Sequence, residues 1–243
     1  MGYDDVMHAS YNLERVVSVG WNLFWESAAA IVPIYLVVYT PLSLLLEFWV
    51  SSGLGGFGVP IKIIIGILQI VEALFGVVAT MGLAVIVDQK VHGHSLSWGE
   101  ALNFAVTRWL PALWTGFVAF WIVMGFFLLF LVPGIVWSIY YYFFVFAVAL
   151  RGVSGMKALA YSKSLVKGKW WRTFGYALAI GFIMSLAQTG AEVILSPLPE
   201  TSVFETVRNI VDNLVSAPFT CMLAIFFLNE DHLKFPWSGN GAL

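Results

Sequence analysis

The chain has 243 residues and a formal net charge of −2; 60% of its residues are hydrophobic and only 11% are charged. Soluble domains carry about 25% charged residues, so this composition excludes an ordinary water-soluble fold. The single cysteine, Cys221, excludes an internal disulfide and a cysteine-based metal cluster. The first residues lack a basic segment followed by an apolar one, and we therefore expect no cleavable signal peptide.

Apolar runs long enough to cross a membrane, which takes about 20 residues, occur six times. They predict an all-α fold, a polytopic membrane protein in which residues 1–243 form a single integral membrane domain. The dipeptide Pro133-Gly134 favours a tight turn and divides a run that is too long for one crossing. The expected spans cover residues 28–50, 61–87, 110–131, 133–150, 171–195 and 204–228.

Lysine and arginine are distributed unevenly between the two sides of these spans. Six spans place both termini on one side, and ten basic residues fall there, whereas only Lys62 and Arg208 fall on the other. Loops rich in lysine and arginine stay in the cytoplasm. We therefore expect both termini to be cytoplasmic.

Three amphipathic segments precede pairs of spans on the expected cytoplasmic side. They cover residues 13–26, 97–108 and 154–168, and helical spacing gives each an apolar and a polar face. Ser97 and Glu100 have the spacing of a capping box, in which each satisfies a free amide at a helix start. Tryptophans follow each segment, as is typical of the membrane interface. The pattern predicts three units, each an interfacial helix followed by a two-span hairpin.

Polar side chains form stripes at helical spacing in three of the expected spans. Ionisable groups inside a membrane are costly and mark functional sites. From the helical rise, several of them lie about 12 to 15 Å below the outer ends of their spans, so they can meet in one cluster. Arg208 and Asp212 are four residues apart and are expected to pair. The stripes also fit helix-to-helix packing, and both interpretations stay open. The members of this intramembrane cluster are Gln69, Glu72, Gln188, Glu192, Arg208 and Asp212.

A basic amphipathic helix is expected over residues 154–168, followed by paired tryptophans. Each lysine near an anionic lipid surface contributes about 1 kcal/mol to binding. The alternative interpretation is that these lysines only fix the topology. The candidate contacts to lipid head groups are Lys157, Lys163, Lys167, Lys169 and Arg172.

No motif for catalysis or cofactor binding is present, and we expect no catalytic residues and no cofactor. His92 and His94 lie in one loop with Asp88 nearby, which is too few ligands for a metal site. The basic residues lack a soluble fold that presents them to nucleic acid, so no nucleic-acid partner is expected.

One stretch resembles a bacterial multi-span family. Pro133-Gly134 is followed, after the next span, by a helix in which Ala158, Leu159, Ser162, Leu165, Gly168, Trp170 and Trp171 match the family's pattern. That family includes the membrane domain fused to some glycerophosphodiester phosphodiesterases and its stand-alone relatives. The resemblance implies a protein of the bacterial inner membrane with about six spans. The soluble catalytic domain is absent from this chain, and its activity is not implied.

These observations lead to one functional expectation and two alternatives. We expect a non-enzymatic integral membrane protein that engages phospholipids or other membrane components, in lipid handling or small-solute transport. The first alternative is an accessory or scaffold subunit of a larger membrane protein complex. An intramembrane enzyme is the least favoured, since no nucleophile–base pair is visible.

Overall fold

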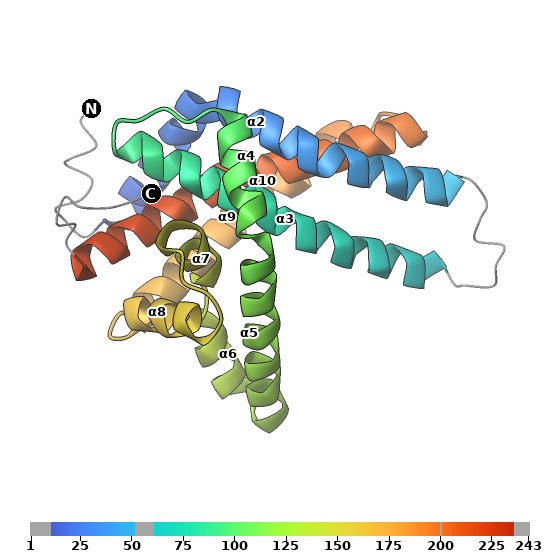
Figure 1. The fold of residues 1–243 in the computed structure, drawn as a ribbon. Helices are drawn as coiled ribbons and strands as arrows, with labels where there is room; N and C mark the ends of the chain where they lie inside the picture. Colours follow the sequence, from blue (N-terminus) through green and yellow to red (C-terminus); the bar gives the residue numbers. More distant parts are fainter. Residues whose placement is uncertain (1–10, 52–60, 200, 236–243) are drawn as a thin grey trace.

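The computed structural model describes residues 11–51, 61–199 and 201–235 of the chain, and these residues form helices and turns without any strand. Figure 1 shows their arrangement. The helices are α2 (Leu13–Ser51), α3 (Ile61–Val91), α4 (Trp98–Thr107), α5 (Trp109–Leu129), α6 (Leu131–Tyr140), α7 (Phe144–Arg151), α8 (Met156–Val166), α9 (Trp170–Leu195) and α10 (Ser202–Lys234).

Six helical stretches in the described part of the chain are long and apolar enough to cross a membrane, as the sequence predicts. Five of them are formed by the single helices α2, α3, α5, α9 and α10, and the sixth by α6 and α7 together. Many outward-facing side chains on them are large and apolar, such as Leu128 and Trp171, which are 82% and 77% exposed. A soluble protein does not leave such a surface uncovered, and lipid is its natural solvent.

The centre of the molecule is the pairing of the first and last described helices. α10 makes its most extensive contact with α2, and also packs on α3 and α9. The crossing is close at Gly20, where an added Cβ would lie 2.6 Å from the Cα of Met222. The α5–α6 hairpin leaves this group and points in another direction (Figure 1). We call the end where α2 turns toward α3 and α9 toward α10 the tip, and the end where α4 and α8 lie the base.

The first predicted interfacial helix does not exist as a separate element. α2 runs without a break from Leu13 to Ser51, about 58 Å, although residues 13–26 and 28–50 are predicted as two elements. The predicted apolar face is real, because Val16, Leu23 and Phe24 are buried in the core. The division was wrong because this face continues into the span, with no residue between them that ends a helix.

The second short helix, α4, begins as its capping box predicts. The backbone amide of Glu100 donates to the Ser97 hydroxyl at 3.3 Å, and the amide of Ser97 donates to the Glu100 carboxylate at 3.0 Å. The Ser97 hydroxyl also donates to the Glu100 carboxylate at 2.6 Å, and this bond, followed by the one from the Ser97 amide, lowers the pKa of Glu100. The cap fixes where the chain turns from the loop after α3 into α4.

The third short helix, α8, packs on protein with the face that was predicted to be apolar. Ala158, Leu159, Ser162, Leu165 and Val166 are all buried, and α8 contacts α5, α6, α7 and α10. At its centre, the Ser162 hydroxyl accepts from the amide of Phe143 at 3.1 Å and donates to the carbonyl of Tyr140 at 2.8 Å. The fourth span is interrupted between α6 and α7 at this point, and Ser162 satisfies backbone groups that the interruption frees.

Candidate functional site

The polar stripes of α3, α9 and α10 meet on the tip side of the molecule. A cavity of about 570 Å³ lies between α2, α3 and α10, and a second of about 420 Å³ lies between α9 and α10. Asn209 and Asp212 line both cavities, so the two are neighbours. The first is lined by Tyr39, Gln69, Glu72, Ala73, Gly76, Val77, Thr80, Val145, Asn209, Asp212 and Asn213. We refer to both together as the polar cavity.

Glu72 is the acidic residue that α3 contributes to the polar cavity. Its carboxylate accepts a hydrogen bond of 2.7 Å from the side-chain amide of Asn213. The same amide nitrogen donates to the carbonyl of Asn209 at 2.9 Å, which holds the Asn213 side chain in place. Asn213 is not among the residues predicted for the cluster, although it follows Asp212 directly.

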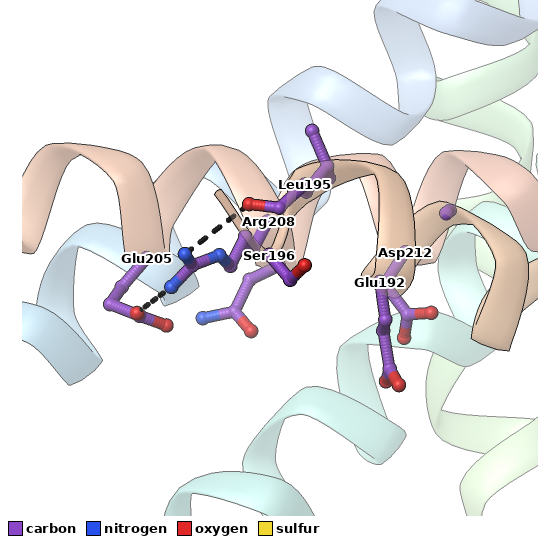
Figure 2. A pocket seen from close by; sticks show the side chains of 8 residues that line it. Glu192, Leu195, Ser196, Glu205, Arg208 and Asp212 are labelled. Carbon is purple, nitrogen blue, oxygen red and sulfur yellow. Dashed lines mark hydrogen bonds and ion pairs between the residues drawn. The ribbon is translucent and has the colours of Figure 1, made fainter. Parts of the chain in front are cut away.

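Asp212 lies at the centre of the polar cavity, with Gln188 of α9 in contact with it. Glu192 and Glu72 are close enough for their charges to act on Asp212. In Figure 2 the carboxylates of Glu192 and Asp212 extend in the same direction from α9 and α10. Thus the structure brings together the members of the predicted polar cluster, Gln69, Glu72, Gln188, Glu192 and Asp212, with Arg208 lining the part of the cavity between α9 and α10.

Arg208 does not pair with Asp212, contrary to the expectation from their spacing. Its guanidinium forms an ion pair with Glu205, one turn nearer the start of α10. It also donates to the carbonyl of Leu195 at 3.3 Å, at the end of α9 (Figure 2), and to the carbonyl of Leu198 at 2.7 Å, in the turn that follows. An acid one turn away and two carbonyls near the helix end thus outcompete Asp212 for the arginine. In the described part of the chain, no ion pair reaches Glu72, Glu192 or Asp212.

At the base, two of the five proposed lipid contacts face a buried acid. The Glu230 carboxylate, 2% exposed, pairs with Lys169 at 2.6 Å and with Arg172 at 2.7 Å. Lys163 lies over the ring of Trp137, 4.1 Å from its centroid, in a cation–π contact. Only Lys157 and Lys167 of the five are exposed at the surface.

The sequence analysis missed the acidic residues that organise the base. Asn229, Glu230 and Asp231 are all buried near the end of α10. Asn229 accepts from the backbone amide of Tyr11 at 3.1 Å, and Asp231 binds Arg151 and Tyr161. Three consecutive polar residues directly after a long apolar run were the available signal. Together they join α10 to the start of α2, to α7, to α8 and to α9.

One histidine of the loop after α3 contacts the protein's own backbone. The His92 ring contacts the backbone carbonyl of Asp88 at 2.7 Å, at the end of α3. Among the described residues, no three histidine, cysteine, aspartate or glutamate side chains are grouped so as to hold a metal ion.

Six helical stretches of membrane-spanning length in the described residues define the class of this protein as a multi-pass helical membrane protein. Residues 27–229 match the model of the family described as a domain of unknown function, DUF7847, and the chain belongs to that family. No curated protein and no solved structure matches the chain. The family description names no phosphodiesterase, so the resemblance to that membrane domain stays a prediction.

Proposed function

We propose that this protein is a non-enzymatic membrane protein that binds a small polar solute in the polar cavity and passes it across the membrane. The observation that carries the proposal is the cavity itself. Carboxylates and amides from α3 and α10 line about 570 Å³ of space within segments of membrane-spanning length, and Glu192 of α9 lines the adjoining part. Ionisable groups within membrane spans are costly, and they mark solute paths in membrane proteins more often than lipid-facing surfaces.

The packing at the base supports solute transport over lipid handling. Lys169 and Arg172 are engaged by Glu230, and Lys163 by Trp137, so these three charges serve contacts within the protein. Lys157 and Lys167 are exposed, and we propose that they contact anionic head groups as an auxiliary attachment. The location that we propose is the bacterial inner membrane with both termini in the cytoplasm. It rests on the excess of lysine and arginine on that side and on the resemblance described above.

A scaffold role is the second candidate, and the α5–α6 hairpin favours it. This hairpin points away from the other long helices (Figure 1), and Phe117, Phe120 and Trp121 along α5 are more than half exposed. Another membrane subunit is a possible occupant of that surface. Co-purification of a stoichiometric membrane partner, together with a transport activity that is indifferent to Glu72→Gln, would favour this candidate.

Accessibility of the cavity to water tests the main proposal. Asn209 lines both parts of the cavity, so a cysteine there, in a Cys221→Ala background, reports directly on the space. In proteoliposomes we expect membrane-impermeant methanethiosulfonate reagents to modify Asn209→Cys. The matched control is Phe182→Cys on α9, whose position is 66% exposed on an apolar surface and should resist charged reagents. Equal resistance at both positions would contradict a solute path.

A further inference from the structure

The polar cavity carries negative charge that its surroundings do not neutralise. Glu72, Glu192 and Asp212 converge there, and Arg208, which lines the smaller part of the cavity, is bound to Glu205 and to the carbonyls of Leu195 and Leu198. The other polar lining groups near Glu72 and Asp212 include the amides of Gln69, Asn209 and Asn213. Amides can orient a ligand but cannot compensate three carboxylates.

A second feature of the cavity points to a ligand independently of the carboxylates. Tyr39 lines the cavity, is 9% exposed, and has no hydrogen-bond partner for its hydroxyl among the described residues. A polar group bound in the cavity would supply the hydrogen bond that this hydroxyl lacks. The hydroxyl lies directly against Gly76, where an added Cβ would lie only 2.8 Å from its oxygen. The glycine therefore allows the phenol its position, and a side chain here would displace the hydroxyl.

Together, these groups define the chemistry of the ligand. Carboxylates accept hydrogen bonds and donate none, and the Tyr39 hydroxyl and the amide oxygens can accept as well. The complementary ligand is a compact cation with several N–H donors, because charge-assisted hydrogen bonds are the strongest available here. A bare metal ion fits less well, since the described residues include no grouped set of three metal ligands.

We infer that the solute is an organic cation with an ammonium group, which Glu72 and Asp212 bind while the Tyr39 hydroxyl contacts it from the side opposite Gly76. This inference rests on the proposed function and specifies its substrate class.

Labelling rates at Asn209→Cys test the inference. In the Cys221→Ala background, we compare a trimethylammonium and a sulfonate methanethiosulfonate reagent, each relative to its rate with free cysteine. Carboxylates that focus the potential in the cavity should favour the cationic reagent by about tenfold. The preference should disappear in the Glu72→Gln/Asp212→Asn double variant. Ethylammonium in the buffer should slow the labelling, while acetate and glycerol should not.

Gly76→Ala tests the role of Tyr39 sterically, because its Cβ would displace the Tyr39 hydroxyl from its place beside position 76. We expect it to weaken protection by ethylammonium at least tenfold. Gly66→Ala, on the same helix and with nothing within 4 Å of the added Cβ, should leave protection unchanged. If either glycine variant misfolds, Tyr39→Phe replaces Gly76→Ala and should also weaken protection.

The outcomes distinguish the ammonium inference from the proposed function on which it rests. Labelling without a cationic preference, or protection by acetate or glycerol as strong as by ethylammonium, overturns the ammonium inference and leaves a solute cavity. Failure of ethylammonium to protect an accessible Asn209→Cys overturns it as well. A cysteine that neither reagent reaches overturns the inference and the proposed function together.

Discussion

Asp231 binds Arg151 across 80 residues of sequence, with the arginine Nε donating to the carboxylate at 2.8 Å. The pair joins the end of α10 to the end of α7 at the base. The Asp231 side chain is 1% exposed and that of Arg151 is 34% exposed, so one partner is shielded from water and the other is partly screened. The two positions are therefore expected to be coupled in stability.

A double-mutant cycle on this pair measures the coupling. Asp231→Asn should lower the free energy of unfolding by about 2–3 kcal/mol, because it leaves Arg151 without its charged partner. Arg151→Gln should cost a similar amount, and the double variant less than the sum. Denaturant unfolding in detergent provides the measurement. Glu14→Gln, at an exposed position on α2, is the control and should be neutral. Strict additivity would show that the pair does not stabilise the base.

Tyr161→Phe should change the response of the protein to alkaline pH. Burial, and then the hydrogen bond to the Asp231 carboxylate, raise the pKa of Tyr161 above its usual value of 10.0. A raised pKa means that the contribution to stability is present below pH 10 and is lost as pH rises toward the folded pKa. The variant should therefore melt lower at pH 8 but lose less of its melting temperature between pH 9 and pH 11. Parallel curves for wild type and variant would contradict the assignment.

Four of the five basic residues at the base should divide into two groups by assay. Lys169→Gln and Arg172→Gln should lower the melting temperature in detergent, since each removes an ion pair to buried Glu230. Lys157→Gln and Lys167→Gln should leave it unchanged, because both side chains are exposed. Lys157→Gln and Lys167→Gln should instead weaken binding of the purified protein to anionic nanodiscs at low salt. The division fails if all four variants behave alike in both assays.

Ser162→Ala should destabilise the junction between α6 and α7. It removes the acceptor for the Phe143 amide and the donor to the Tyr140 carbonyl, at a cost of about 1–3 kcal/mol for buried groups left unpaired. Ser164→Ala on the same helix removes only a bond to the nearby carbonyl of Tyr161 and should cost little. Hydrogen exchange should show faster exchange of the Phe143 amide in Ser162→Ala alone.

Gly20→Ala should disturb the central helix pair. The added methyl group meets backbone atoms of Met222, which cannot move without separating α2 from α10. We expect a loss of at least 2 kcal/mol, the range found for overpacked cores. Gly175→Ala on α9, with open space around the added Cβ, should be neutral or stabilise by up to about 1 kcal/mol. Similar stabilities for both variants would show that the crossing is looser than described.

Hydropathy predicts the number of membrane-length helices well because each span must contain its own apolar run. The buried face of α8 was also predictable, since Leu159, Leu165 and Val166 repeat at helical spacing. What covers that face was not predictable: an apolar stripe has the same pattern whether it packs on lipid or on protein. The unbroken α2 was missed for a related reason, because a change from amphipathic to uniformly apolar sequence does not end a helix.

Long-range electrostatic partners were the least predictable part of the candidate site. Spacing placed Asp212 within reach of Arg208, but the arginine had a local acid and two backbone carbonyls as competitors. Pairs such as Lys169 with Glu230 are separated by 61 residues, and no local pattern encodes them. The convergence of Glu72, Gln188 and Asp212 was predictable because each lies at a similar depth on a membrane-length helix.

The pairing of α2 with α10 has a consequence for how the protein is made. Synthesis runs from the N-terminus, so the first membrane helix must wait in the bilayer until the last one leaves the ribosome. During that interval the Gly20 surface of α2 has no native neighbour, and the chain depends on lipid or on an insertion chaperone to protect it. Truncation within α10 should therefore send the protein to membrane proteolysis, even though five earlier spans have already been inserted.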